Sequence, residues 1–118
     1  MRVFYFEIPA ADCERAKNFY SKAFGWTYNS FPAETPYYFI STGDPSEEGI
    51  NGGLMQQFAQ GQPVTNIIRV DSVEDACRLI EENGGQVVVP RFEIPGVGWK
   101  AYFKDTEGNI FGVAEMAA

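Results

Sequence analysis

Hydrophobic and polar positions follow the same order twice along the chain. Residues 3–8 alternate as a strand does, and apolar positions then recur at helical spacing over residues 12–24. Residues 66–70 alternate again, and a second helical pattern begins at Ser72. Asp12 and Ser72 are of the types that accept hydrogen bonds from the first amides of a helix, so both helices have a predicted start. Each unit is too small to bury a core alone, so the repeat predicts two units that pack together around a cavity.

Three more strands are predicted after each helix. They cover residues 26–30, 37–42 and 52–57 in the first half, and residues 86–90, 98–103 and 110–115 in the second. Pro90 is predicted to end its strand, and Gly108 to supply the positive φ of a hairpin turn. The order β-α-β-β-β therefore occurs twice, which predicts a single α+β domain. Its first module spans about residues 1–57, a linker about 58–63, and its second module about 64–118.

Composition limits the classes of function. With 118 residues, 45% of them hydrophobic, the chain can bury one core. The net charge of −7 argues against binding to nucleic acid or to an anionic membrane, because both need clustered Lys and Arg. No apolar run reaches the length of a membrane span, and the N-terminus lacks the layout of a signal peptide, so we expect a cytoplasmic protein.

Candidate chemistry is restricted because the chain contains no histidine, the commonest metal ligand and the commonest acid or base near neutral pH. Both cysteines lie on predicted helices, which is not the arrangement of a disulfide scaffold and fits a reducing compartment. Cys13 lies at a helix start, where the pKa of a thiol falls, but no histidine can activate it, so a structural role is favoured. Asp105 and Glu107 could act as a carboxylate pair, yet their position favours a solvated turn.

Several short motifs together resemble one known family. They are Phe6 to Asp12, Glu14-Arg15-Ala16, Phe19-Tyr20, Phe24-Gly25-Trp26, and Asp105 to Asn109 leading into Phe111-Gly112. The combination spans essentially the whole chain and resembles the vicinal oxygen chelate superfamily, which contains glyoxalase, bleomycin-resistance and extradiol-dioxygenase-like proteins. The resemblance implies two tandem β-α-β-β-β modules whose curved mixed sheet forms a half-barrel, with a concave ligand cavity between the modules. It also implies a homodimer.

Catalytic members of this superfamily hold a divalent metal with His, Gln or Glu side chains on the inner strand faces. The resemblance places the corresponding positions at Tyr5, Thr65 and Gly112, with a fourth near Met55 or Gln56. A phenol and a hydroxyl are weak ligands for a divalent cation, and glycine offers no side chain. The resemblance therefore implies a metal-free member without a cofactor that binds a small, partly apolar molecule. The alternatives are a divalent-metal-dependent lyase or dioxygenase and a dimeric interaction module without a ligand.

Strand alternation indicates which side chains face the predicted cavity. If Tyr5 points inward, Glu7 shares its face, and Thr65 shares a face with Arg69 in the second module. Such a set, with one acid, one base, a phenol and apolar walls, suits a small and partly apolar ligand. The predicted ligand-binding residues are Tyr5, Glu7, Met55, Thr65, Arg69, Trp99 and Tyr102, and none of them is predicted to bind a metal.

These candidates also have structural interpretations. Glu7 and Arg69 could form an ion pair, and Tyr5 could be a core aromatic residue whose hydroxyl reaches water. Trp99 and Tyr102 could stack on a ligand or fill the half-barrel, and packing is favoured for at least one of them. Glu115 is predicted to face away from the cavity because of its parity on the last strand.

Overall fold

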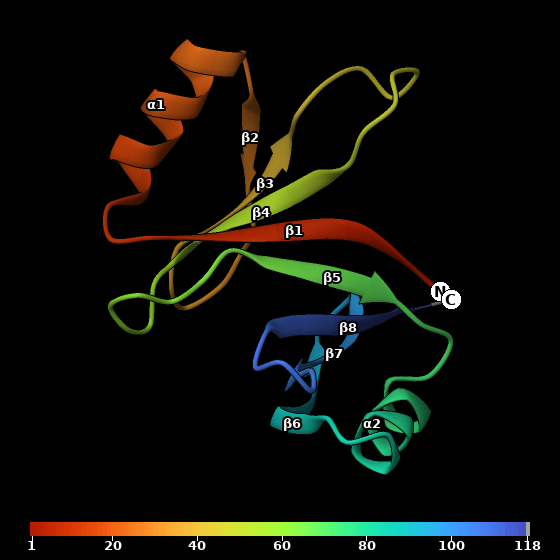
Figure 1. The fold of residues 1–118 in the computed structure, drawn as a ribbon. Coiled ribbons are helices and arrows are strands. Elements are labelled where there is room, and N and C mark those ends of the chain that lie inside the picture. Colours follow the sequence, from red (N-terminus) through yellow and green to blue (C-terminus); the bar gives the residue numbers. More distant parts are fainter. Residues whose placement is uncertain (118) are drawn as a thin grey trace. The chain divides into compact units, whose positions relative to one another are not determined.

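The computed structural model describes residues 1–117 and contains, over that range, two α-helices and eight β-strands (Figure 1). The elements in chain order are β1 (Arg2–Ala10), α1 (Cys13–Phe24), β2 (Thr27–Ser30), β3 (Tyr37–Ser41), β4 (Asn51–Gln56), β5 (Thr65–Arg69), α2 (Val73–Glu82), β6 (Gln86–Ile94), β7 (Gly98–Lys104) and β8 (Ile110–Met116). The chain divides into two compact units. The N-terminal unit is Tyr5–Val64, and the C-terminal unit combines Met1–Phe4 with the chain from Thr65 onward. Residue 118, the predicted end of the second module, lies outside the described residues.

The two units repeat one topology. In the N-terminal unit the strand order is β2-β3-β4-β1, with β1 parallel to β4 and the other neighbours antiparallel. In the C-terminal unit the order is β5-β8-β7-β6, with β5 parallel to β8 and the other neighbours antiparallel. The α+β class and the twofold β-α-β-β-β order are therefore confirmed.

Helix α1 covers one face of the N-terminal unit. Its N-cap is Asp12, whose carboxylate accepts a hydrogen bond from the Arg15 amide at 3.0 Å, and its C-cap is Gly25, whose φ of 77° is left-handed. The core of this unit contains the buried residues Cys13 of α1, Ile40 of β3 and Leu54 of β4, and partly buried apolar side chains of β1, α1, β2 and β3 pack against it. Because side chains alternate along a strand, the residues between these core positions lie on the face opposite α1.

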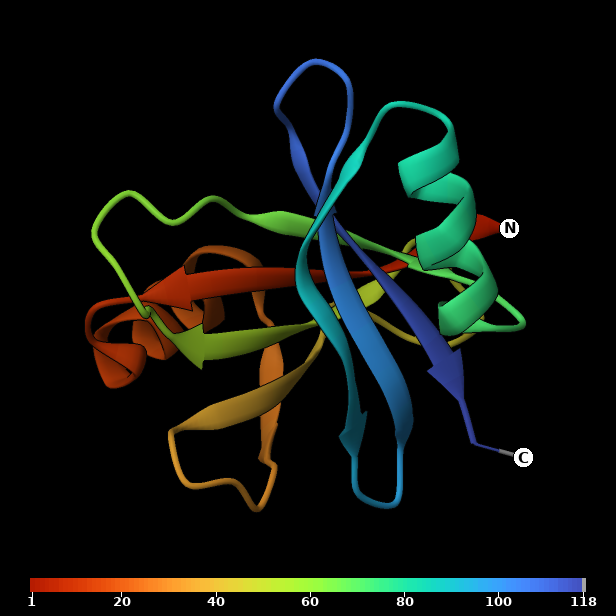
Figure 2. The ribbon, with the colours of Figure 1, turned by 90° about the horizontal axis from the view of Figure 1, so that it is seen from below.

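Helix α2 packs against β6, β7 and β8 of the C-terminal unit (Figure 2). The core beneath it contains the buried residues Val70, Val73, Ala76, Ala101 and Val113. In each unit, therefore, a helix packs against one face of the strands.

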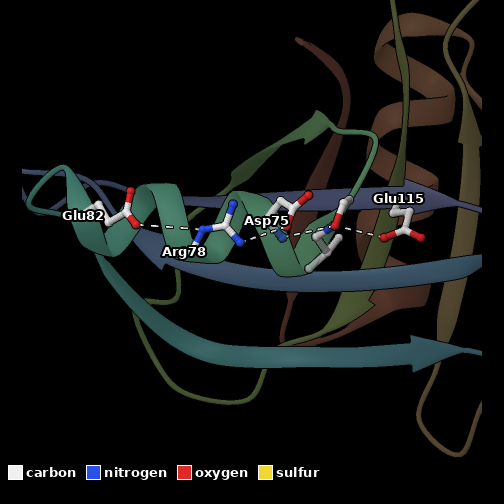
Figure 3. Close-up of polar contacts among 6 residues, drawn as sticks. Asp75, Arg78, Glu82 and Glu115 are labelled. Atoms are coloured by element: carbon white, nitrogen blue, oxygen red, sulfur yellow. Dashed lines mark hydrogen bonds and ion pairs between the residues drawn. The ribbon is translucent and has the colours of Figure 1, made fainter.

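Two side chains satisfy the first amides of α2 (Figure 3). The Ser72 hydroxyl accepts from the Asp75 amide at 3.1 Å, which confirms the predicted cap. The Glu115 carboxylate, from β8, accepts from the Val73 amide at 3.0 Å. The second bond fixes the helix start to the sheet and shows that Glu115 is on the helix side, as its parity predicted. On the outer surface Arg78 bridges Asp75 and Glu82, an exposed arrangement that contributes little stability.

The prediction that Pro90 ends its strand is wrong. Strand β6 continues through Pro90 to Ile94, although its pairing with β7 shifts register between Val87 and Val89 and again between Val89 and Phe92. Proline cannot donate a ladder hydrogen bond, so it is tolerated at an edge strand or at a bulge. β6 is the last strand in the order, so it is an edge strand, and its pairing is irregular around Pro90. Proline is therefore tolerated there on both grounds.

Neither α1 nor α2 has the length and apolar character needed to cross a bilayer, which holds for all helices within residues 1–117.

Candidate functional site

A buried carboxylate and two phenols form a hydrogen-bonded group on the face of the N-terminal unit opposite α1. The Tyr37 hydroxyl donates to Glu7 Oε2 at 2.6 Å, and the Tyr5 and Tyr37 hydroxyl oxygens lie 3.2 Å apart. Glu7 is 2% exposed, whereas Tyr5 is half-buried and within reach of solvent. We call these three residues the phenol–carboxylate cluster.

The cluster depends on a glycine in the strand between its members. β4 lies between β1 and β3, and Gly53 of β4 pairs with Glu7 on one side and with Phe39 on the other. A Cβ at Gly53 would overlap the Tyr37 hydroxyl and lie 2.8 Å from the Tyr5 hydroxyl. Two phenols from the flanking strands can therefore meet above β4 only because this position has no side chain.

Burial and charge keep both phenols protonated. The pKa of Tyr5 is raised to about 12, first by burial and also by the negative charge of Glu7, while the bond to Tyr37 lowers it. The pKa of Tyr37 is raised far above its ordinary value, again first by burial and then by the charge of Glu7. Both side chains thus have a hydroxyl hydrogen to donate throughout the neutral range.

An aromatic wall adjoins the cluster on the same face. The rings of Phe31, Tyr37 and Phe39 meet edge to face, with centroids 5.3 to 6.0 Å apart. Half-buried Met55 pairs with Tyr37 across the β3–β4 ladder. A small number of polar atoms beside several apolar groups is the usual composition of a small-molecule site.

The C-terminal unit also carries polar groups on the sheet face opposite its helix. Thr65 and Lys100 are only 6% and 7% exposed. The Lys100 ammonium lies 5.8 Å from the centre of the Tyr102 ring, and Tyr102 stacks on Phe92. Lysine is seldom buried to this extent unless it has a partner, so Lys100 is a functional candidate that the sequence analysis missed.

The comparisons with known proteins agree with this architecture. A family model described as bleomycin resistance protein-like N-terminal matches residues 2–43, which include all three members of the phenol–carboxylate cluster. A glyoxylase-like domain-containing protein of Didymella fabae is 32% identical over 91% of this chain and 88% of its own length. The chain belongs to the glyoxalase-like family. Its membership of the vicinal oxygen chelate superfamily, inferred from the motifs, is thereby confirmed.

Other relatives of this glyoxalase-like protein are more distant. The protein CFP32 of Mycobacterium bovis, whose name proposes a glyoxylase, is 27% identical over 91% of this chain, and this chain spans 42% of its length. The crystal structure of methylmalonyl-CoA epimerase from Mycobacterium tuberculosis has a TM-score of 0.76 at 15% identity and covers 99% of this chain and 89% of its own. A Streptomyces coelicolor methylmalonyl-CoA epimerase variant in complex with 2-nitronate-propionyl-CoA has a TM-score of 0.77 at 15% identity and covers 100% of this chain and 99% of its own. These structures share the fold.

The residues at the superfamily's metal positions do not fit a divalent cation in this glyoxalase-like protein. Gly112 has no side chain, and the place where its Cβ would stand lies 2.5 Å from the Ile67 Cδ1 atom and 3.3 Å from the Tyr102 ring. Tyr5 is a protonated phenol bonded to Tyr37. Within residues 1–117, no group of three or more His, Cys, Asp or Glu side chains is arranged to hold a metal ion. The donor set is too poor for the oxygen-rich or nitrogen-rich coordination that these cations take.

Each unit contains some of the predicted site residues. Tyr5 and Glu7 join through Tyr37, and Met55 lies on the same face. Tyr102 and Thr65 lie on the face of the C-terminal unit opposite α2, and Arg69 is an exposed residue of β5.

Trp99 is a packing residue rather than part of this surface. It packs against the core beneath α2, and the Arg91 guanidinium lies 3.7 Å from the centre of its ring. Because Trp99 and Tyr102 are three positions apart in β7, alternation places them on opposite faces. The packing alternative thus applies to Trp99.

The turn that follows β7 is a solvated turn, as its sequence favoured. Asp105 accepts from the amides of Glu107 and Asn109 at 2.8 and 2.9 Å, and these bonds lower the pKa of the Asp105 carboxyl. Gly108 has the expected positive φ, at 85°. The Asp105 carboxylate therefore holds the turn together, while within residues 1–117 the Glu107 carboxylate accepts only from the adjacent Thr106 hydroxyl.

Tyr37 is a second functional candidate that the sequence analysis did not name. One feature of the sequence pointed to it, because two adjacent glycines inside a predicted strand indicate a close approach by a neighbouring group. Gly53 is one of those two, and the groups that approach it are the hydroxyls of Tyr37 and Tyr5.

A separate hollow of about 380 Å³ lies along α1 and is lined by Ala10, Ala11, Asp12, Arg15, Ala16, Phe19 and Tyr20. It follows the helix, on the other side of the sheet from the phenol–carboxylate cluster, so the two features are distinct. Its polar members include the helix cap, whose carboxylate already accepts the Arg15 amide.

Proposed function

We propose that this glyoxalase-like protein binds a small, partly apolar molecule without the help of a metal ion. The observation that carries the proposal is the phenol–carboxylate cluster, in which a carboxylate that is 2% exposed is joined to two phenols beside an aromatic wall. Buried polar groups are costly to maintain, so such a group on a face away from the helix favours a functional role.

The chemistry of the surface suggests how a ligand would be held. Met55, Phe31 and Phe39 offer apolar contact, and Phe39 is partly exposed. Tyr5 and Tyr37 are only partly buried, unlike Glu7, so their hydroxyls are the polar groups of the cluster that we expect a ligand to meet. In the C-terminal unit, the Lys100 ammonium supplies a positive charge beside the aromatic ring of Tyr102.

The alternative is a divalent-metal-dependent lyase or dioxygenase of the vicinal oxygen chelate type. Names of relatives that contain glyoxylase favour an enzyme. Against a metal-dependent reaction stands the donor set described above, in which one position is glycine and another a protonated phenol. We therefore place binding before metal catalysis.

Two measurements test the proposal. Elemental analysis of protein purified without chelator, with thermal shifts in Ni²⁺, Zn²⁺, Mn²⁺, Fe²⁺ and Mg²⁺, should find no stoichiometric metal and no stabilisation, because only a cation that binds the folded state raises its stability. A ligand-observed NMR screen of small aromatic fragments should give saturable binding that weakens in Tyr5→Phe and in Glu7→Gln. Tyr38→Phe is the control, because Tyr38 lies on the opposite face of β3. One metal ion per chain, or fragment binding that is unchanged in both Tyr5→Phe and Glu7→Gln, would contradict the proposal.

We also propose that the protein is a homodimer in the cytoplasm. The acidic composition and the superfamily support this, as do the exposed aromatic residues Phe19 and Phe24 on α1. Sedimentation velocity over a hundredfold range of concentration should show a dimer, and a monomer mass throughout would contradict it. A dimer that binds no fragment would instead favour the interaction-module alternative.

A further inference from the structure

The aromatic wall beside the phenol–carboxylate cluster has a regular internal geometry. It consists of Phe31, which follows β2, and of Tyr37 and Phe39 of β3. The planes of Phe31 and Tyr37 are inclined by 71°, those of Phe31 and Phe39 by 82°, and those of Tyr37 and Phe39 by 74°. The three rings are therefore nearly perpendicular to one another. This is a favourable arrangement, because it sets the positive edge of one ring against the negative face of another.

Hydrogen bonds hold the wall in place before any ligand binds. The Phe31 amide donates to the Tyr37 carbonyl oxygen at 2.9 Å and closes the connection between β2 and β3. The Tyr37 ring is also fixed at its far end, because its hydroxyl donates to Glu7 at 2.6 Å. A surface whose rings are already oriented loses little conformational entropy when a ligand binds.

Part of the wall is accessible from solvent. Phe39 is 38% exposed, and Phe31 and Tyr37 are half-buried. The neighbour of Phe39 on β4 is Gly53, so β4 places no side chain beside Phe39 at that position. A ligand can therefore lie against the wall.

A flat ring that stacks on one member of this wall stands nearly perpendicular to the other two, because the three planes are themselves nearly perpendicular. An aromatic ligand thus gains an offset-stacked contact and edge-to-face contacts in one position. A saturated ring of the same size buries a similar apolar area, but it has no quadrupole and gains only the hydrophobic contribution.

We infer that the wall selects ligands with an aromatic ring over ligands with a saturated ring of the same size. The inference rests on the proposed binding function and names the class of ligand that the site takes. Phe39 is the main specificity-determining residue, because it is the most exposed ring of the wall. The hydrophobic effect alone does not favour the aromatic ring, since it depends on the apolar area removed from water.

Benzyl alcohol and cyclohexylmethanol test the selection, because they are neutral probes with the same carbon skeleton and the same hydroxyl group. Amide titrations in two-dimensional NMR give both dissociation constants and show that each variant is folded. We expect the wild-type protein to bind benzyl alcohol about tenfold more tightly. That factor corresponds to about 1.4 kcal/mol, which is what one or two aromatic contacts contribute beyond area burial.

Replacing phenylalanine by leucine removes a ring and keeps an apolar side chain. In Phe39→Leu we expect the ratio of the two dissociation constants to fall to about three, because the most exposed ring is lost. In the double variant Phe31→Leu/Phe39→Leu we expect a ratio of about one, with the affinity for cyclohexylmethanol within about twofold of the wild-type value. Phe19→Leu is the matched control and should keep the wild-type ratio, because Phe19 is an exposed phenylalanine of α1, on the other side of the sheet.

The position of the bound probe gives a second readout. Intermolecular nuclear Overhauser effects should join the ring protons of benzyl alcohol to those of Phe31 and Phe39 in the wild-type protein. If amide signals report binding while these effects are absent, the probe lies elsewhere and the inference is overturned.

The outcomes separate this inference from the function on which it rests. Equal or tighter binding of cyclohexylmethanol to the wild-type protein overturns the selection and leaves the binding function standing. A preference for benzyl alcohol that survives in the double variant also overturns it, because the selection would not then come from the wall. If neither probe binds while the fragment screen succeeds, the inference alone fails. If neither probe binds and the fragment screen is also negative, the binding function fails with it.

Discussion

The substitution Tyr37→Phe removes one oxygen atom from the centre of the phenol–carboxylate cluster and leaves the ring in place. That oxygen donates at 2.6 Å to a carboxylate that is 2% exposed, and it also contacts the Tyr5 hydroxyl at 3.2 Å. A hydrogen bond to a charged group contributes about 1.5–3 kcal/mol to stability, because its loss leaves a charged acceptor less well satisfied. We therefore expect Tyr37→Phe to lower the free energy of unfolding by about 2 kcal/mol.

Urea unfolding at pH 7, followed by far-ultraviolet circular dichroism, measures this change. With a slope of about 2 kcal/mol per molar urea, the loss corresponds to a midpoint about 1 M lower at unchanged slope. Tyr38→Phe is the matched control, because Tyr38 is the neighbouring residue and its hydroxyl lies 3.5 Å from the exposed Glu14 carboxylate. We expect that control to lie within about 0.5 kcal/mol of the wild-type protein.

The comparison of these two variants decides whether the cluster contributes to stability. If Tyr37→Phe and Tyr38→Phe shift the midpoint equally, the short hydrogen bond from Tyr37 to Glu7 makes no net contribution to the free energy of unfolding. The argument that a bond to a buried carboxylate stabilises the fold would then be refuted. A change in slope without a change in midpoint would mean that the surface exposed on unfolding had altered.

Three further predictions concern other parts of the structure. Because folding raises the pKa of Tyr5 from 10.0 to about 12, chiefly by burial, the protonated phenol is favoured in the folded state. The contribution of Tyr5 to the free energy of unfolding should therefore be fully present below pH 10 and be lost as the pH rises from 10 to 12. Between pH 9 and pH 11 the free energy of unfolding should fall less in Tyr5→Phe than in the wild-type protein. Gly53→Ala should cost about 3 kcal/mol in urea unfolding, because a Cβ there overlaps the phenol hydroxyls, whereas in Gly43→Ala the Cβ would meet only the flexible end of a side chain and cost less than about 0.5 kcal/mol. Glu115→Ala should cost about 1 kcal/mol in the same assay because the Val73 amide loses its acceptor, and Glu115→Gln, which keeps an acceptor oxygen, should recover most of that loss.

Local order was readable from the sequence because it depends on neighbours along the chain. The helix starts at Asp12 and Ser72 follow from side chains that accept from amides three residues later. Gly25 and Gly108 occupy left-handed positions that glycine adopts most easily. The repeated β-α-β-β-β order follows from periodicity, and the motifs added the family.

Only part of the site could be predicted from the sequence, because strand alternation assigns a side chain to a face but does not say which residues lie beside it. Tyr5 and Glu7 were placed on one face correctly, but the meeting of Glu7 with Tyr37, 30 residues away, depends on the register of β1, β4 and β3. For Trp99 and Tyr102 the sequence left ligand contact and packing open, and only the core beneath α2 decided that Trp99 packs there.

The sequence by itself determined the elements, their order and the family, since capping, turn chemistry and strand periodicity act over a few residues. Tertiary structure alone decided that Pro90 lies within a strand, because an edge position makes its missing donor harmless. It also decided that the Tyr37 hydroxyl meets both the Glu7 carboxylate and the Tyr5 hydroxyl above Gly53, because strand register and the free volume over a glycine arise only when distant segments pair.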